Sequence, residues 1–377
     1  MSWPTVSLGD LAEIRSGGTP PRSKKEYYGG EIPWVKIGDL DEVSSFVRKT
    51  EETITEEGLK AIRGRLFPRG TLLFAIYGSV GKMSFAGVPL ATNQAILGIS
   101  VDQSRVDQKF LFHSLAAKRA ELLSDGVGVT QKNLSSKYMR DLQLPLPPLE
   151  EQRRIAGILD AADALRRRRR EALALLDTLP GAIFAEMFML GSSTAPLFKL
   201  SELGKISTGA TPPSKLDGMF DGDIPFVTPG DLDTNDPVAR RVTEAGAQKS
   251  RTVPSGSTLV SCIGNIGKIR QTTERVAFNQ QINAIEWSDR IVPDYGTEAI
   301  RFIKRAIQGA ATSTTLPILK KSLFQMFEIP CPDRHLQEEY SKRVDNINQQ
   351  REQLMSHVSE LDTLFNTLQS RAFAGEL

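Results

Sequence analysis

Apolar residues recur every seven positions in two interleaved rows, and this pattern appears in two long stretches of the chain. An a/d heptad carried by two equivalent helices predicts that the helices pair with each other. The alternative is that each helix is amphipathic and packs on its own domain. The predicted pairing residues are Ile155, Ile158, Leu165, Leu176 and Leu179 in the first helix, and Val344, Ile347, Leu354, Val358, Leu361, Phe365 and Leu368 in the second.

The two helices differ in their predicted ends. Pro180-Gly181 predicts a kink or an end near the last turn of the first helix, because proline lacks the amide hydrogen that an interior helical position needs. The second helix has no such breaker between residues 335 and 373.

Two charged features interrupt the apolar rows. Arg351 stands at an a position of the second helix, where a polar residue fixes register at a cost in stability. In the five-arginine run 166–170, at least Arg166 or Arg169 must point toward the interface between the two helices, which we call the seam. The outward arginines either contact phosphate or an acidic partner protein, or simply form a solvated face.

A mixed pattern of short strands and helices precedes each long helix. Apolar runs at 71–77 and 257–263 are bounded by Gly and Pro and predict strands. Alternating prolines at 145–148 and 330–332 close each mixed region. We therefore predict an α/β (α+β) fold with two similar globular domains and two helical spacers. The predicted boundaries are 1–147 and 196–332 for the globular domains, and 148–190 and 333–377 for the spacers.

The chain also repeats itself. Thr-Pro-Pro at 19–21 recurs at 211–213, which is 192 positions later (211 minus 19), and Gly-Asp-Leu at 38–40 recurs at 230–232. Asn-Gln at 93–94 recurs at 279–280 with an offset of 186, and Leu-Asp-Thr-Leu at 176–179 recurs at 361–364 with an offset of 185. A period this long is not that of a solenoid. It predicts a duplicated domain with approximate internal two-fold symmetry.

Composition excludes several classes of protein. The chain has 377 residues, of which 40% are apolar and 24% charged, with a net charge of +2. We expect no secretory leader and no membrane span, which would need about 18 consecutive apolar residues. The two cysteines favour neither a disulfide framework nor a zinc site, so no metal site is predicted and the expected location is cytoplasmic. The small net charge requires any basic surface to be local.

Candidate DNA contacts fall first in a Gly/Pro-rich loop that both copies carry. Such loops place lysines on phosphates and polar side chains on base edges, although a surface loop that needs Gly and Pro for its turns is the alternative. The candidates are Thr19, Arg22, Lys24, Lys25 and Tyr27 in the first copy, Thr211, Ser214 and Lys215 in the second, and the equivalent pair Lys36 and Thr228 that follows the next strand.

Further candidates lie in a Gly-x-x-Gly-Lys turn and an Asn-Gln pair. The turn is not a P-loop, since Ile76 and Cys262 stand where its first glycine would be. It predicts either a phosphate-facing lysine or a plain hairpin turn. The amides could read adenine, or form a structural network. These candidates are Ser79, Lys82, Asn93 and Gln94, with Asn265, Lys268, Asn279 and Gln280.

Two later polar loops differ between the copies while their surroundings do not, and they are predicted to contact bases. Their candidates are Gln131, Lys132 and Asn133 in the first copy, and Thr314, Thr315, Lys320 and Lys321 in the second. No catalytic motif of a methyltransferase, serine hydrolase or zinc protease occurs, and three histidines leave little for acid–base chemistry. We therefore predict a chain without catalytic residues.

The whole chain resembles the specificity (S) subunit of type I restriction–modification systems. The resemblance rests on Leu-Gly-Asp-Leu at 8–11, Gly-Gly-Thr-Pro at 17–20, Ile-Pro-Trp-Val at 32–35, Gly-Asp-Leu at 38–40, Asn-Gln at 93–94 and the run Pro-Leu-Pro-Pro-Leu-Glu-Glu-Gln-Arg-Arg-Ile at 145–155. The second copy departs from the last element at 332–339 but keeps the start of the helix.

The resemblance implies two target-recognition domains, each reading one half of a bipartite asymmetric DNA site. It implies that the two long conserved helices form an antiparallel coiled coil with pseudo-two-fold symmetry, which acts as a ruler. It also implies docking of two methyltransferase (M) subunits that use S-adenosylmethionine, and of restriction (R) subunits that use ATP and Mg. The S chain itself would bind no cofactor. The alternatives are the specificity chain of a type IIB-like or other defence-system methyltransferase complex, and a nuclease with an unrecognised centre.

Overall fold

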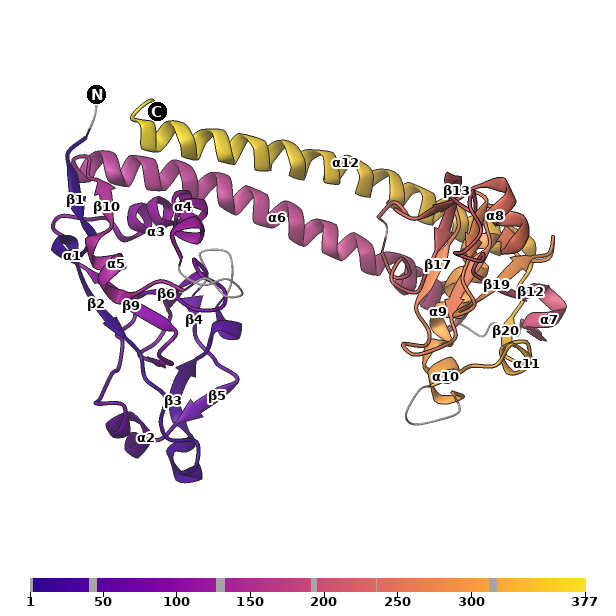
Figure 1. The fold of residues 1–377 in the computed structure, drawn as a ribbon, viewed down its shortest axis with the longest axis horizontal. Coiled ribbons are helices and arrows are strands. Elements are labelled where there is room, and N and C mark those ends of the chain that lie inside the picture. The colour runs from indigo at the N-terminus through magenta and orange to yellow at the C-terminus, as the bar shows by residue number, and fades with distance from the viewer. Residues whose placement is uncertain (1–2, 41–45, 127–132, 191–194, 235, 312–316) are drawn as a thin grey trace. The chain divides into compact units, whose positions relative to one another are not determined.

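The computed structural model describes residues 3–40, 46–126, 133–190, 195–234, 236–311 and 317–377 (Figure 1). Contacts divide the chain into two compact units. Unit 1 comprises residues 1–169 and 357–377, and unit 2 comprises residues 170–356. Each unit mixes helices and strands, as the sequence predicted, and each long helix contributes one part to each unit.

Unit 1 is built around a five-stranded sheet. Its strand order is β2 (Ala12–Ser16), β9 (Ile96–Val101), β6 (Leu72–Ala75), β7 (Met83–Ala86) and β4 (Phe46–Val47). All four residues of β6 are buried, which explains why that strand reads as a continuous apolar run. The helices α3 (Gln108–Ala117) and α4 (Arg119–Asp125) contribute Leu111, Leu115 and Leu122 to the core of the sheet.

Two smaller sheets complete unit 1. The strands β1 (Thr5–Ser7) and β10 (Gln143–Pro145) pair antiparallel, next to α1 (Leu8–Leu11) and α5 (Ser136–Asp141). A second sheet has the order β5 (Glu52–Ile54), β3 (Tyr28–Val35) and β8 (Ala91–Thr92), with Trp34 buried at its centre. Around it lie the short helices η1 (Lys25–Tyr27), η2 (Ile37–Asp39) and α2 (Glu56–Ala61).

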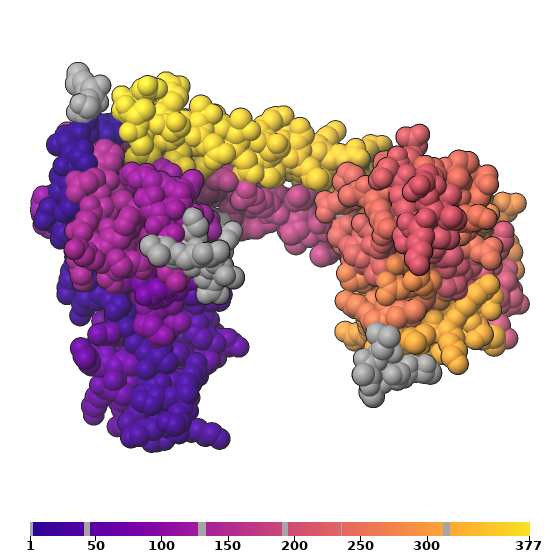
Figure 2. Space-filling view, in the orientation of Figure 1, coloured from indigo at the N-terminus to yellow at the C-terminus, as the bar shows by residue number. Residues whose placement is uncertain are grey.

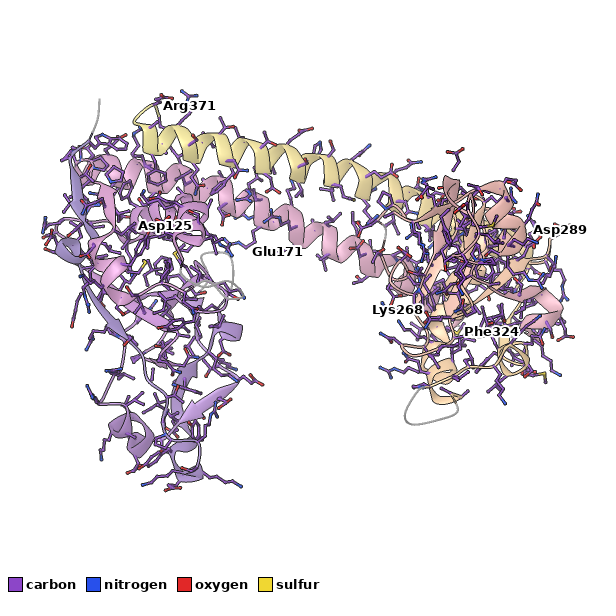
Figure 3. The ribbon with its side chains drawn as sticks, viewed as in Figure 1. Asp125, Glu171, Lys268, Asp289, Phe324 and Arg371 are labelled. Atoms are coloured by element: carbon purple, nitrogen blue, oxygen red, sulfur yellow. The ribbon has the colours of Figure 1, made fainter. Side chains whose placement is uncertain are left out.

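Unit 2 repeats this plan. The strands β11 (Leu197–Lys199) and β20 (Glu328–Pro330) pair antiparallel, next to α7 (Leu200–Leu203). One sheet has the order β12 (Gly204–Thr208), β19 (Ile282–Trp287), β16 (Thr258–Ser261) and β17 (Ile269–Gln271). The other has the order β14 (Arg241–Val242), β13 (Phe220–Val227), β18 (Val276–Phe278) and β15 (Arg251–Val253). The helices are α8 (Glu244–Lys249), α9 (Pro293–Phe302), α10 (Lys304–Gly309) and α11 (Lys321–Phe324), whose Phe324 is fully buried (Figure 3).

The repeat extends to a backbone irregularity in equivalent strands. In β3 the register shifts between Tyr28 and Ile32, and in β13 it shifts between Phe220 and Ile224. Gly29 has φ +81° at the first shift, and Asp221, 192 positions later, has φ 63° at the second. The left-handed conformation therefore belongs to the bulge itself, and the second copy keeps it without glycine.

Each long helix begins with a buried glutamine that ties it to its globular part. The helix α6 (Leu149–Phe188) carries Gln152, and α12 (Arg334–Ala374) carries Gln337 185 positions later; both side chains are fully buried. The Gln152 Oε1 atom accepts a hydrogen bond from the amide of Asp107 at 2.8 Å, and its Nε2 donates to the carbonyls of Arg105 and Pro147 at 3.0 and 2.9 Å.

Gln337 makes the same three hydrogen bonds in the second copy. Its Oε1 accepts from the amide of Val292 at 2.8 Å, and its Nε2 donates to the carbonyls of Arg290 and Pro332 at 3.1 and 2.9 Å. Asp107 and Val292 are the N-cap residues of α3 and α9. We call this arrangement the glutamine latch: one side chain joins the start of the long helix, the preceding proline segment and the start of a domain helix.

The two long helices pair antiparallel, which confirms the predicted pairing. In unit 1, Ile155 and Leu159 of α6 pack in one cluster with Phe365 and Ala372 of α12. Figure 2 shows the C-terminal part of α12, in yellow, lying along this part of α6. In unit 2, Asp177 of α6 pairs with Arg351 of α12 at 2.8 Å. Within unit 2 the Pro180 carbonyl also accepts from the Tyr340 hydroxyl at 3.3 Å, so residue numbers rise on one helix as they fall on the other.

One of the two rows predicted for the first helix is wrong by one residue. In the row of Ile155 and Leu176 these two residues are buried and half-buried, and Arg169 is exposed. In the predicted second row Ile158 is half-buried, but Leu165 and Leu179 are 42% and 38% exposed. The second row that turns inward lies four residues after the first row rather than three, at Leu159, Arg166, Leu173 and Pro180. Apolarity alone favoured leucine over arginine and proline at these positions, and tertiary contacts decided otherwise.

Arg166 shows why a charge fits the seam. Its Nε pairs with Asp362 at 2.7 Å, its Nη1 with Asp163 at 3.3 Å, and its guanidinium carbon lies 4.3 Å from the ring centroid of Phe365. A half-buried guanidinium that has both carboxylate partners and an aromatic face is compatible with a helix interface. Arg169 is exposed, so Arg166 is the member of the arginine run that turns inward.

Of the two outcomes predicted at Pro180-Gly181, a kink or an end of the first helix, the end is wrong, since α6 continues to Phe188. The reason is tertiary packing beyond the proline. Phe184 and Phe188 are buried, with ring centroids 5.4 and 4.9 Å from that of Tyr295. Proline inside a helix costs about 3 kcal/mol, and burial of two aromatic side chains offsets such a cost.

Replacing Gln152 with Leu should destabilise the chain by about 2–3 kcal/mol, because three backbone groups would lose their only side-chain partner in a dry site. The measurement is equilibrium unfolding in urea. Gln143→Leu is the matched control, because Gln143 is exposed and donates a single hydrogen bond to Asp141. Equal stability of the two variants would show that the latch contributes nothing to stability.

Candidate nucleic-acid interface

In both copies the Gly/Pro-rich loop is held against the Asn-Gln turn. The Thr19 hydroxyl donates to Gln94 Oε1, and the Thr211 hydroxyl donates to Gln280 Oε1 at 2.6 Å. A Cβ on Gly17 would collide with the carbonyl oxygen of Asn93, and a Cβ on Gly209 would collide with that of Asn279. The glycines are therefore required by a close backbone approach. The structure brings these predicted residues together in the same way twice.

The two amides of each Asn-Gln pair have different roles. Asn93 Oδ1 accepts from the Ala95 amide at 3.1 Å, and Asn279 Oδ1 accepts from the Gln281 amide at 3.1 Å, so the asparagines close their own turns. Gln94 and Gln280 are exposed and use only their carbonyl oxygens on the threonines, within the described ranges. Their amide N–H groups make no hydrogen bond to any residue that the structure describes.

The Gly-x-x-Gly-Lys motif forms a hairpin turn with two left-handed glycines in each copy. The φ angles are +67° and +82° at Gly78 and Gly81, and +76° and +84° at the equivalent Gly264 and Gly267. Lys82 Nζ donates to the carbonyl of Leu40 at 3.1 Å, which ties that side chain to the protein.

Lys268 follows the equivalent turn between β16 and β17 (Figure 3). Its side chain is half-buried and makes no hydrogen bond or ion pair to any residue that the structure describes. Ser79 and Asn265, within the two turns, are exposed. The two turns therefore differ in their lysines: the ammonium group of Lys82 is bonded to the protein, and that of Lys268 has no partner among the described residues.

The Gly-Asp-Leu motif is explained by a turn after the β3 and β13 strands. Asp39 Oδ2 accepts from the amide of Lys36 at 2.7 Å, and Asp231 Oδ2 accepts from the amide of Thr228 at 2.8 Å. The side chains of the two candidates are also engaged within the protein. Lys36 Nζ pairs with Glu51 and Glu52 at 2.7 and 2.8 Å, and the Thr228 hydroxyl donates to Asp231 at 2.7 Å.

An arginine lies over a pair of aromatic rings in each copy. In unit 1 the guanidinium carbon of Arg22 lies 4.6 Å from the ring centroid of Tyr28 and 5.0 Å from that of Trp34. Its Nη1 and Nη2 pair with Glu52 at 2.5 and 3.3 Å. The side-chain hydrogen bonds from Arg22 and Lys36 lower the pKa of Glu52 to about 2, so this carboxylate stays charged at neutral pH.

In unit 2 the equivalent rings carry Arg240, the residue just before β14. Phe220 and Phe226 stand 192 positions after Tyr28 and Trp34, and Arg240 lies 4.6 and 5.3 Å from their centroids. Arg240 is exposed, and its guanidinium makes no hydrogen bond or ion pair to any residue that the structure describes. Sequence reasoning missed Arg240. The aromatic pair was detectable at the 192 offset, but the segment before β14 that supplies the arginine was not.

The remaining candidates lie on the surface or outside the described residues. Lys24 Nζ donates to the Tyr27 hydroxyl at 3.1 Å. Asn133 is half-buried, and its Oδ1 has no hydrogen-bond partner among the described residues. The exposed candidates are Lys25, Ser214, Lys215, Lys320 and Lys321. The candidates outside the described residues are Gln131, Lys132, Thr314 and Thr315.

Two searches bear on other classes of site. No group of three His, Cys, Asp or Glu side chains is placed to hold a metal ion in the described part of the chain. Of the helices that the structure describes, none combines the length and the apolarity needed to cross a membrane.

Comparisons with known proteins follow the same two-fold division. The family model described as type I restriction modification DNA specificity domain matches residues 2–174 and 194–360. The chain is 27% identical over 246 residues to the type I restriction enzyme MjaIX specificity subunit of Methanocaldococcus jannaschii, covering 60% of this chain and 57% of that one. It is 27% identical over 172 residues to the EcoR124I/EcoR124II specificity subunit of Escherichia coli, covering 44% and 41%. The match thus spans about half the length of these relatives.

Two solved structures share the fold. One is the type I restriction–modification S subunit from M. genitalium, with a TM-score of 0.59, 17% identity and coverage of 99% of this chain and 96% of that one. The other comes from a structural study of complex assembly and conformational transition in a type I restriction–modification system, with a TM-score of 0.63, 18% identity and coverage of 100% and 98%. The predicted architecture and the resemblance are confirmed. Because the family model covers both halves, this chain belongs to the type I restriction–modification DNA specificity family.

Proposed function

We propose that this chain is the sequence-specificity subunit of a type I restriction–modification complex, and that it reads a bipartite asymmetric DNA site. The observation that carries the proposal is the duplicated domain with a shared framework and different exposed polar groups. Family membership over both halves supports it. In this proposal the chain docks two methyltransferase subunits and the restriction subunits in the cytoplasm, and these partners supply S-adenosylmethionine, ATP and Mg chemistry.

The shared framework supports equivalent orientation of the two modules. The glutamine latch, the threonine–glutamine hydrogen bond and the aspartate-closed turn recur with the same atoms in both units. None of these contacts carries sequence information about DNA. They would present whatever surface each module has in the same direction.

The groups presented on this framework differ, which supports two different half-sites. The guanidinium of Arg22 pairs with Glu52. The guanidinium of Arg240 lies over the equivalent aromatic pair and has no ion pair with a described residue. Lys36 is exchanged for Thr228 after the next strand. Because base edges are read by the pattern of donors and acceptors, modules with different donors would prefer different bases.

The proposed boundaries of the modules are 1–147 and 196–332, with helical spacers at 148–190 and 333–377. We propose that the spacers act as the ruler that sets the number of unspecified base pairs between the half-sites. The chain would contribute recognition rather than chemistry, since no catalytic function is indicated for the specificity subunits it resembles.

Exchanging residues 1–147 for the equivalent module of a related chain should change one half-site and leave the other untouched, because each module would read its bases independently. The measurement is the preference of the complex with its methyltransferase subunit across a panel of duplexes substituted in each half. The matched control is the reciprocal exchange of residues 196–332, which should change the opposite half. A change in both half-sites after either single exchange would contradict modular reading.

Arg240→Lys should weaken the preference for one G·C pair in the second half-site, by about 1–3 kcal/mol, because lysine keeps the charge but loses the planar fork. Binding measurements on single-substituted duplexes check this. Arg241→Lys is the control, since that neighbouring guanidinium donates to the Asp223 carbonyl. If Arg240→Lys leaves the relative affinities of all duplexes unchanged, Arg240 does not read a base.

A further inference from the structure

A basic cleft of about 480 Å³ lies in unit 1, where α6 passes beside α3 and the edge of the sheet. Its wall is a row of three phenylalanine rings, Phe46, Phe85 and Phe112, with neighbouring centroids 5.5 Å apart. Phe46 is 48% exposed at the mouth, and the other two rings are buried. The cleft is completed by Arg48, Lys109, Asp160, Ala164 and Arg167.

The charge of this cleft is positive and only partly compensated. Three cations and one carboxylate line it, which leaves a net charge of +2. Lys109 pairs with Asp160, which also hydrogen-bonds His113 Nε2 at 2.8 Å. Arg48 and Arg167 make no ion pair or hydrogen bond to any residue that the structure describes. Two guanidinium groups are therefore left for a ligand.

The position of Arg48 is built into the fold. It follows directly on β4, which pairs in parallel with β7 through Phe46 opposite Phe85. A Cβ on Gly87, just after β7, would lie 2.6 Å from Cγ of Arg48 and 2.9 Å from the carbonyl oxygen of Val47. The absence of a side chain at Gly87 gives the apolar stem of Arg48 its path along the sheet edge.

At two of the charged positions of this cleft the second copy carries the opposite charge. The two latch glutamines set the offset at 185, so Lys109 corresponds to Asp294 and Arg167 to Glu352. Phe112 corresponds to Thr297, whose hydroxyl bonds that of Thr258. A surface that docked the same partner protein on both copies would keep its charge. The change of sign at these two positions argues against a partner protein that docks in the same way on both copies.

We propose that this cleft binds a phosphodiester of the DNA backbone, with Arg48 and Arg167 on the phosphate oxygens and the phenylalanine wall against the deoxyribose. The inference rests on the proposed function and adds a positioning site that carries no base readout. Guanidinium groups suit phosphate because their planar donors match its oxygens.

A polyanion suits the surroundings better than a single carboxylate of a partner protein. Arg168 and Arg169 continue the run of α6 beyond the cleft, are exposed, and make no ion pair within the described ranges. Two further guanidinium groups are therefore exposed next to the cleft, on the neighbouring faces of α6. A DNA strand presents a phosphate at every nucleotide and can follow such a surface.

The test uses the full chain in complex with its methyltransferase subunit, and two labelled duplexes, one with the target and one scrambled. Affinities are measured between about 50 and 200 mM KCl, over which each phosphate contact accounts for roughly a 3.5-fold change. Arg48→Gln and Arg167→Gln should each weaken binding to both duplexes alike and make the log–log salt slope shallower by about 0.9. The Arg167→Lys variant should keep the log–log salt slope of the unmodified chain.

Arg153→Gln is the matched control, because Arg153 is an exposed arginine on the same helix outside the cleft and should leave the slope unchanged. Unchanged slopes in the cleft variants, or an equal effect of Arg153→Gln, would overturn the proposal. So would a changed target-to-scrambled ratio, or loss of the methyltransferase subunit by mass photometry with the DNA slope intact. If the unmodified complex fails to distinguish the two duplexes, the proposed function fails, while the slope comparison still decides the phosphate site.

Discussion

The buried amide at the start of each long helix is the contact on which the rest of the structure depends. Gln152 and Gln337 each satisfy one backbone N–H and two backbone carbonyls in a site without exposure. A long helix joined to a domain only through a loop could leave it in many directions. Three hydrogen bonds to the proline segment and to the N-cap of a domain helix leave one direction, and they do so identically in both copies. If one of these hydrogen bonds were lost, the buried polar group left without a partner would cost about 1–3 kcal/mol. The latch therefore strongly favours a single geometry.

That geometry lets one framework carry two surfaces. The contacts that recur between the copies are internal: the latch, the glycine loop against the Asn-Gln turn, and the aspartate that closes the turn after the central strand. The contacts that differ are at the surface. Equivalent aromatic pairs hold Arg22 with its carboxylate in one copy and, in the other, Arg240, which has no ion pair with a described residue. The charge reversal from Arg167 to Glu352 adds a difference on the helices themselves. Internal repetition with external divergence is what recognition of an asymmetric site requires.

Much of the architecture could be predicted from the sequence, because periodicity and repetition report on backbone geometry directly. The duplicated layout and the pairing of the two long helices followed from spacing, and their antiparallel orientation followed from the family resemblance. The errors arose where a tertiary contact outweighs a local preference. Arg166 replaces Leu165 in the seam because Asp163, Asp362 and Phe365 surround it, and α6 passes Pro180 because aromatic packing holds its last turns. Among the site candidates, the internal partners of Lys36 and the place of Arg240 depended on cross-strand register, which short strands do not reveal.

The central claim is that two modules on one framework specify two separated segments of DNA. It is tested most directly by sequencing modified bases in the genome of a host that carries the methyltransferase gene, with and without the gene for this chain. The account predicts that a bipartite motif, with two specified segments and an unspecified gap of constant length, is modified only when this chain is present. A contiguous motif, a gap of variable length, or the same modification without this chain would contradict it.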